Sequence, residues 1–122
     1  KQVIGVQAEK APAAYLSWGK GYVVESKMET SAEGLATRVG FNLTQSILHD
    51  MLDDFILVSE DELNKAIAFH LEYTHTLTEH AGAASLAAAI KIKNQLEGKK
   101  VVIVVSGGNI TVEQIKTALS TC

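Results

Sequence analysis

The stretch VVIVVSGGNI, Val101 to Ile110, decides the fold class of this chain. Five apolar β-branched residues run without a polar break and then give way to Ser-Gly-Gly-Asn. Such a run is typical of a strand buried on both faces, as in a parallel sheet. Thr111, with Gln114 three residues later, then predicts the start of a helix. A strand that leads directly into a helix indicates an α/β fold.

The same alternation extends back toward the start of the chain. Val3–Val6, Tyr22–Ser26 and Phe55–Ser59 are further short strand candidates. Capping signals and apolar periodicity predict helices that begin near Pro12, Asn42, Ser59, Ala81 and Thr111. We therefore expect a single α/β domain over residues 1–122, with a three-layer, mostly parallel sheet and helices on both faces.

The Ser106–Asn109 loop is the first candidate for a binding site. Ligands of such folds sit beyond the carboxyl ends of the strands, where this loop is expected. Its two glycines allow close approach of the backbone to a ligand, and the next helix start offers free N–H groups. A plain strand-to-helix turn would use the same residues. From spacing alone, both readings stay open.

Composition limits the classes of function. The chain has 122 residues, a net charge of −3 and no basic stripe that would bind nucleic acid or an anionic membrane. No apolar run approaches the roughly 20 residues that cross a bilayer, and no signal peptide is visible. The one cysteine, Cys122, is the last residue, so no internal disulfide is expected. These features predict a cytoplasmic protein.

Other clusters of reactive side chains give only weak evidence for a catalytic or metal site. His70, His75 and His80 stand near Glu79, but intervals of five turn the histidines to different helical faces. Asp53 and Asp54 have the pattern of a solvated turn, and no nucleophile stands beside a base in a known arrangement. We expect no metal site, and the residues alone do not name a reaction.

Five segments carry a resemblance to a known family: VIGVQAE, SAEGLA, DDFILVSEDEL, TEHAGAASLAAA and VVIVVSGGNI. In order and separation they closely resemble the later part of threonine dehydratases (threonine ammonia-lyases), pyridoxal-phosphate enzymes related to serine racemase and serine dehydratases. The resemblance covers essentially all 122 residues. It implies the carboxyl-terminal part of a catalytic domain with the tryptophan-synthase-β-like fold (fold type II).

The resemblance also implies a function. The parent enzyme would use pyridoxal 5'-phosphate to convert L-threonine (or L-serine) to 2-oxobutanoate (or pyruvate) and ammonia. Its partners would be the amino-acid substrate, the remainder of the catalytic domain and further copies in a dimer or tetramer. A catabolic role and isoleucine biosynthesis both stay open. Two alternatives remain: a serine racemase-like parent, or a non-catalytic α/β binding or interaction module derived from the family.

Site residues follow from the matched motifs. Ser106 matches the serine whose hydroxyl bonds the pyridine nitrogen, and Gly107 lets the ring approach the backbone. A neutral hydroxyl there makes the ring a moderated electron sink, which favours loss of a β-hydroxyl over transamination. Gly34 and Glu79 match positions beside the cofactor, and Glu33 matches an acidic position near the substrate. The structural alternatives are a solvated loop carboxylate at Glu33 and a helix first-turn residue at Glu79.

Two departures from the family limit these expectations. The Schiff-base lysine, in a Ser-x-Lys-x-Arg-like segment, and the glycine-rich phosphate loop are absent from these residues and would precede Lys1. The chain also enters a strand-like run by Val3 without an initial methionine, so we expect an inactive piece of a longer enzyme. Serine racemase-like members hold a divalent metal where this chain has Gln7 and Ala13, so no metal is expected there.

Overall fold

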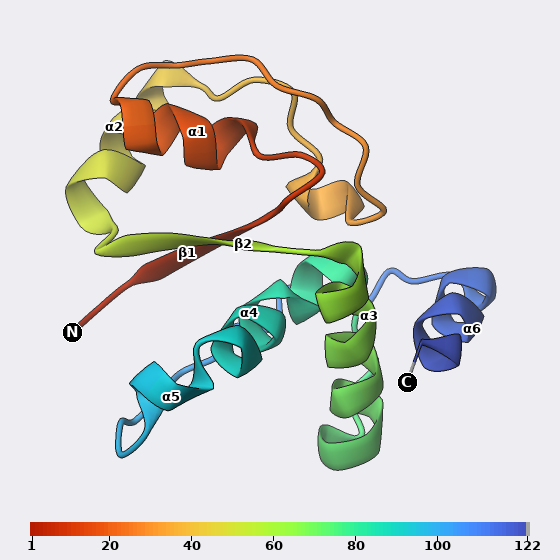
Figure 1. Cartoon of the computed structure of the whole chain (residues 1–122). Coiled ribbons are helices and arrows are strands. Elements are labelled where there is room, and N and C mark those ends of the chain that lie inside the picture. The colour runs from red at the N-terminus through yellow and green to blue at the C-terminus, as the bar shows by residue number, and fades with distance from the viewer. Residues whose placement is uncertain (122) are drawn as a thin grey trace.

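The computed structural model describes residues 1–121 (Figure 1), and Cys122, with the interpretation that rests on it, lies outside the described residues. The elements, in chain order, are β1 Ile4–Ala8, α1 Ala13–Lys20, the 3₁₀ helix η1 Glu33–Leu35, α2 Asn42–Met51, β2 Asp54–Val58, α3 Glu60–Phe69, the π-helix η2 His70–Thr74, α4 His80–Lys91, α5 Lys93–Leu96 and α6 Val112–Ser120.

The two strands form a parallel pair between layers of helices. Gly5 of β1 pairs with Phe55 of β2, and Val6 pairs with Ile56. In Figure 1, α1 and α2 lie on one side of the pair and α3 and α4 on the other. Two of the predicted strands and the expected α/β layering are therefore confirmed.

Alternation along β1 and β2 sends different side chains to the two helical layers. On the α1 side, Phe55 meets Tyr15 edge to face at 5.8 Å between ring centroids and Trp18 at 5.9 Å. A Cβ at Gly5 would lie 3.0 Å from the Phe55 ring, so glycine makes room for that aromatic cluster. On the other side, Val58 is fully buried in the main core.

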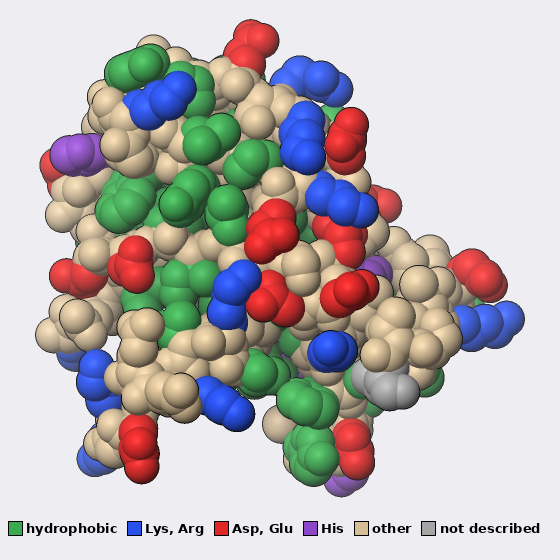
Figure 2. Space-filling model, viewed as in Figure 1, with side chains coloured by type: hydrophobic (Ala, Val, Ile, Leu, Met, Phe, Trp, Pro, Cys, Tyr) green, Lys and Arg blue, Asp and Glu red, His purple; other side chains and the backbone are tan. Residues whose placement is uncertain are grey.

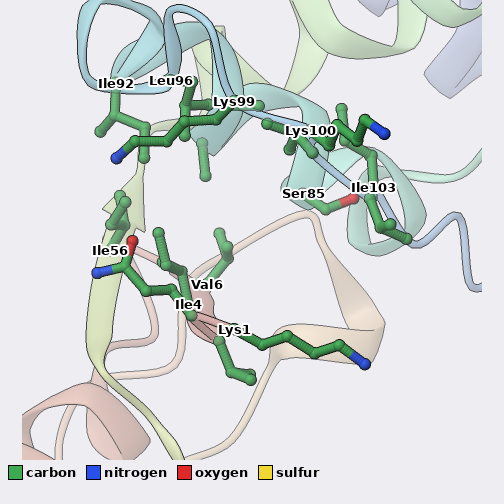
Figure 3. A pocket seen from close by; sticks show the side chains of 16 residues that line it. Lys1, Ile4, Val6, Ile56, Ser85, Ile92, Leu96, Lys99, Lys100 and Ile103 are labelled. Atoms are coloured by element: carbon green, nitrogen blue, oxygen red, sulfur yellow. The ribbon is translucent and has the colours of Figure 1, made fainter.

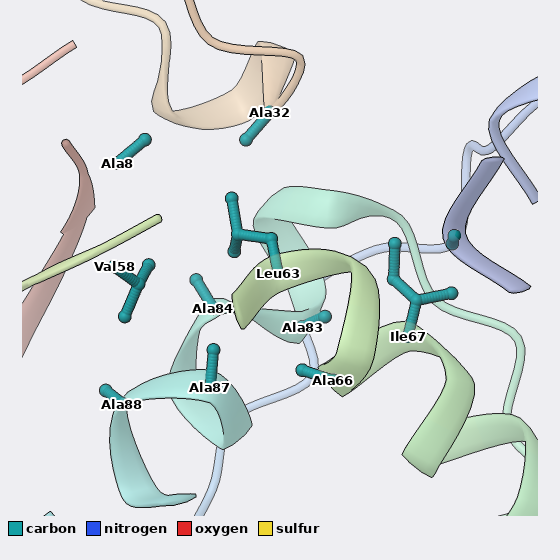
Figure 4. Packing of buried hydrophobic residues seen from close by; sticks show 11 residues of the cluster. Ala8, Ala32, Val58, Leu63, Ala66, Ile67, Ala83, Ala84, Ala87 and Ala88 are labelled. Atoms are coloured by element: carbon teal, nitrogen blue, oxygen red, sulfur yellow. The ribbon is translucent and has the colours of Figure 1, made fainter. Parts of the chain in front are cut away.

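Small side chains let α4 approach the strands and α3 closely (Figure 4). Leu63 and Ile67 of α3 are fully buried in this core with Val58. The remaining members of the cluster are alanines: Ala8, Ala32, Ala66, Ala83, Ala84, Ala87, Ala88 and Ala118. The close packing that the alanine-rich sequence predicts is confirmed.

Helix caps agree with the sequence at α3 and α6 but not at α2. Ser59 and Thr111 each complete a capping box, with Glu62 and Gln114 respectively. At α2 the predicted Asn42–Gln45 box is wrong, because Phe41 occupies the cap position. The Gln45 side chain instead donates to the Ala14 carbonyl of α1, at 3.3 Å. Contact with α1 has replaced the local cap.

The apolar face of α2 is largely exposed. Leu43, Ile47 and Met51 are exposed, and the buried residue of this helix is Gln45. Helical periodicity marks an apolar face, but it does not say what covers that face.

Two predicted strands do not form within residues 1–121. Tyr22–Ser26 contributes only an isolated antiparallel bridge, between Glu25 and Val39. The Val101–Val105 segment has no regular structure, and Val102 is 90% exposed. A strand exists only through backbone pairing with a neighbour, and the described residues bring no strand to this segment.

None of the helices in the described part of the chain is both long and apolar enough to cross a bilayer.

Candidate functional site

The Ser106–Asn109 loop is bonded to the segment that precedes α4. The Glu79 backbone N–H donates to the Gly107 carbonyl at 3.1 Å. The hydroxyl of Thr78, which is fully buried, donates to the same carbonyl at 3.0 Å. Two regions nearly thirty residues apart in sequence, roughly 78–79 and 106–107, therefore meet at one carbonyl oxygen.

Glycines make this meeting possible. A Cβ on Gly107 would overlap the Glu79 carboxylate, and a Cβ on Gly82 would collide with the Thr78 hydroxyl. A Cβ on Gly108 would lie 2.9 Å from the Leu77 carbonyl oxygen. The glycines of the loop and of α4 thus allow these two protein segments to approach each other closely.

The segment carrying Glu33 and Gly34 lies against the first turn of α4. A Cβ on Gly34 would stand 2.8 Å from the Cβ of Ala81, so η1 and α4 touch there. Glu33, beside it, is exposed. Gly34 and Gly107 therefore both contact the start of α4, on which Glu79 occupies the N-cap position.

The predicted site residues are thus gathered, although they come from three separate segments. Ser106 is exposed next to Gly107, and within residues 1–121 its hydroxyl has no hydrogen-bond partner. Glu79 is half-buried beside Gly107. Sequence reasoning missed Thr78 and Gly82, which hold the loop. The sequence signal for these two residues was the motif TEHAGA, in which Thr78 directly precedes Glu79 and Gly82 follows it three residues later.

A buried histidine follows Glu79 directly. A ring nitrogen of His80 lies 3.0 Å from the Asn64 side-chain oxygen. Burial lowers the pKa of His80 and outweighs the opposite effect of the Glu60 and Glu79 charges. Burial also lowers the pKa of His70, whose Nε2 has no partner among the described residues. Both imidazoles are therefore held in the neutral form at neutral pH.

We expect the free energy of unfolding to fall as the pH is lowered from about 7.5 to about 5. Both pKa values lie below the ordinary 6.5 in the folded chain, so the unfolded chain binds protons first. Urea titrations at the two pH values measure the change. The His80→Gln variant should show a shallower fall, and an unchanged slope would contradict this assignment.

The exposed Ser106 hydroxyl fits pyridoxal phosphate, the cofactor that the motifs imply. This hydroxyl can bond a ring nitrogen, and Glu79 adds a carboxylate beside Gly107. The Cβ positions of Gly107 and Gly108 are taken by the Glu79 carboxylate and the Leu77 carbonyl oxygen, so these two glycines serve the packing of the loop itself.

The position matched to the family's metal site is used otherwise. The Gln7 side-chain oxygen accepts from the Tyr15 N–H at 2.9 Å, and its nitrogen donates to the Thr37 hydroxyl at 3.0 Å. Ala13 is buried and has no side-chain oxygen. No group of three or more histidine, cysteine, aspartate or glutamate side chains suited to a metal occurs among the described residues.

Magnesium should therefore leave the chain unchanged. Mg²⁺ prefers carboxylate oxygens, and the amide of Gln7 already bonds two protein partners. We expect the melting temperature to be the same with millimolar magnesium chloride and with chelator, as measured by calorimetry. A rise with magnesium that disappears in the Gln7→Ala variant would show that the site binds metal.

A groove of about 670 Å³ lies along the later part of α4, from Ser85 onward, away from the Glu79 end (Figure 3). Its walls are the β1 side chains Ile4 and Val6, the α4 end, and the segment that begins at Val101. Figure 2 shows a group of exposed hydrophobic side chains between the strand pair and the α4–α5 segment. Sequence analysis did not predict the groove, because its lining comes from segments far apart in the chain.

Comparison with known proteins gives a consistent result. The model of the family described as "Pyridoxal-phosphate dependent enzyme" matches residues 1–107. An L-threonine ammonia-lyase of Thermotoga maritima is 41% identical over 116 residues, which are 93% of this chain and 28% of that protein. A serine racemase of Schizosaccharomyces pombe is 33% identical over 98% of this chain and 37% of its own length.

A solved structure shows the same fold. The processed form of threonine deaminase isoform 2 from Solanum lycopersicum superposes with a TM-score of 0.89 at 25% identity, covering all of this chain and 36% of that one. The chain thus spans between 28% and 37% of the lengths of these three proteins.

Proposed function

The chain belongs to the pyridoxal-phosphate dependent enzyme family, and we propose that it forms the carboxyl-terminal part of the catalytic domain of an L-threonine ammonia-lyase. The observation that carries this proposal is the loop of Ser106 held at Glu79 through the Gly107 carbonyl. The 41% identity to the Thermotoga enzyme supports threonine as the substrate. The fold is the α/β fold of fold type II members of the family.

The residues of this chain have distinct roles in the proposal. When bound, pyridoxal phosphate supplies an electron sink for loss of the β-hydroxyl and then ammonia. Ser106 would bind the ring nitrogen through its hydroxyl, and Gly107, which packs against Glu79, would hold this loop beside the ring. Gly34 and Glu79, both at the start of α4, would stand beside the cofactor, and Glu33 would lie near the amino-acid substrate.

The groove is proposed as the seat of the remainder of the catalytic domain. β1 pairs with β2 on one edge, and within the described residues its other edge has no strand partner. Val101 and Val102 are exposed on the opposite wall, by 47% and 90%. A strand placed between these walls would pair with both, and the relatives are long enough to supply one.

Cellular setting completes the proposal. We place the enzyme in the cytoplasm, as a dimer or tetramer, in amino-acid metabolism. Whether it is catabolic or serves isoleucine biosynthesis depends on the effectors that it binds.

The test begins with the reading frame that encodes the chain. We expect a Ser-x-Lys-x-Arg-like segment upstream of Lys1 and, in the expressed product, formation of 2-oxobutanoate from L-threonine. A product with that lysine that leaves threonine unchanged would refute the proposal. A reading frame without the lysine would instead favour the non-catalytic module.

Serine racemase is a second candidate because its Schizosaccharomyces pombe member matches 98% of the chain. Chiral chromatography after incubation with L-serine separates the two activities. We expect pyruvate to exceed D-serine, and the reverse ratio would favour the racemase.

A further inference from the structure

Glu60, the first residue of α3, bonds the loop that carries Glu33 and Gly34. The Thr30 hydroxyl donates to Glu60 Oε1 at 2.6 Å. The backbone N–H of Ser31 donates to Oε2 at 2.9 Å, and the Ser31 hydroxyl donates to the same oxygen. Both carboxylate oxygens of Glu60 are thus occupied by a segment about thirty residues earlier in the chain.

The hydrogen bonds continue from this carboxylate toward the site. The Ala32 N–H donates to the Thr30 hydroxyl at 3.1 Å, and the Leu35 N–H donates to the Ala32 carbonyl at 2.8 Å. Ala32 itself is fully buried in the core. Glu33 and Gly34 are the residues enclosed by these bonds, so the position of the Thr30–Ser31 turn sets where they lie.

The loop that begins at this turn also contacts α4, through Gly34. Gly34 and Ala81 approach so closely that a Cβ on the glycine would stand 2.8 Å from that of the alanine. Glu79 lies two residues before Ala81. A loop that moved away from α3 would therefore also separate Gly34 from the α4 start.

Glu60 is not needed to cap its own helix. Ser59 and Glu62 complete the capping box of α3, and Asp61 adds a further charge to the same turn. Burial alone would raise the pKa of Glu60, but the bonds from Ser31 and Thr30 and the charge of Lys10 hold the pKa below its ordinary value. The carboxylate is thus ionised and committed to the loop.

We propose that Glu60 is a positioning residue, whose carboxylate holds Thr30 and Ser31 and thereby fixes Glu33 and Gly34 against the start of α4. This inference rests on the proposed function in one respect, the assignment of Glu33 and Gly34 to the site. Glu60 acts through the loop and touches neither substrate nor cofactor.

The first test measures the loop in the cofactor-free enzyme that carries this chain. Hydrogen–deuterium exchange of a peptide spanning residues 30–36 should be about 10-fold faster or more in Glu60→Gln, because bonds to a charged acceptor are lost. Asp61→Asn is the matched control, since it removes the same charge from the same turn without bonding Thr30 or Ser31. Unchanged exchange in Glu60→Gln would overturn the proposal.

A second variant covers the case in which Glu60→Gln disturbs α3. Ser31→Ala removes the hydroxyl that donates to Glu60 and leaves the helix sequence intact. We expect it to speed exchange over residues 30–36 while peptides from Leu63–Ala68 keep wild-type rates. Combined with Glu60→Gln it should add little, because both changes break one contact. Full additivity would show that the two residues act independently and would overturn the proposal.

The last measurement asks whether the held loop matters for the reaction. In the enzyme that carries this chain, Glu60→Gln should lower kcat for L-threonine about 10-fold, with a smaller change in KM, and Asp61→Asn should alter neither. Faster loop exchange with unchanged kcat would overturn the positioning role. Failure of the wild-type enzyme to act on threonine would refute the proposed function instead, and the exchange rates would still decide whether Glu60 holds the loop.

Discussion

The purified 122-residue chain, mixed with pyridoxal phosphate and L-threonine, should form 2-oxobutanoate no faster than the free cofactor does. The reaction needs a lysine amine within bonding distance of the cofactor. Lys91 is committed elsewhere: it bonds Glu62 at 3.1 Å, the Leu57 carbonyl at 2.9 Å and Glu9 at 3.4 Å.

The other lysines offer no replacement. Within residues 1–121, no lysine side chain hydrogen-bonds Ser106, Gly107 or Glu79. Lys99 and Lys100 line the groove and precede the segment whose far end carries Ser106. The remaining lysines are Lys1, Lys10, Lys20, Lys27, Lys65, Lys93 and Lys116.

The assay follows 2-oxobutanoate and the visible absorbance of lysine-bound cofactor. A mixture of free lysine and cofactor at matched amine concentration is the control. Turnover clearly above that control would show that the chain is catalytic by itself and would refute its assignment as part of a larger catalytic domain.

Replacement of Ser106 by alanine should lower the turnover of the intact enzyme by about one to three orders of magnitude. The Ser106 hydroxyl is exposed and has no partner in the described residues, so its loss removes no contact of the folded chain. The effect should therefore appear in kcat and leave the melting temperature of the cofactor-free protein unchanged.

Ser120→Ala is a suitable control, because that exposed hydroxyl bonds only within α6, to the Thr117 carbonyl. It should leave turnover at the wild-type level. Full activity of Ser106→Ala at saturating cofactor would remove Ser106 from the site and leave Gly107 and Glu79 as its remaining candidates.

Local signals in the sequence predicted the elements that form by local interactions. Ser59 with Glu62 and Thr111 with Gln114 cap α3 and α6 as predicted, because a capping box involves only four consecutive residues. Gly21 ends α1 in the left-handed conformation, which glycine adopts without strain. The alanines of α4 pack as their size requires.

Predictions failed where a distant segment decides. The Asn42 cap is absent because Gln45 reaches α1, which no local pattern records. Val101–Val105 is not a strand because it lacks a strand partner among the described residues. Periodicity reports which face is apolar, whereas burial and pairing depend on what lies opposite.

The same division holds for the site. The sequence by itself determined the family, through motifs that carry Glu33, Gly34, Glu79, Ser106 and Gly107. Only the tertiary structure decided how they meet: through the Gly107 carbonyl shared by Thr78 and Glu79, and through the carboxylate of Glu60. Motif spacing is a property of the chain alone, but a hydrogen bond across some thirty residues exists only when folding brings its two ends within about 3 Å.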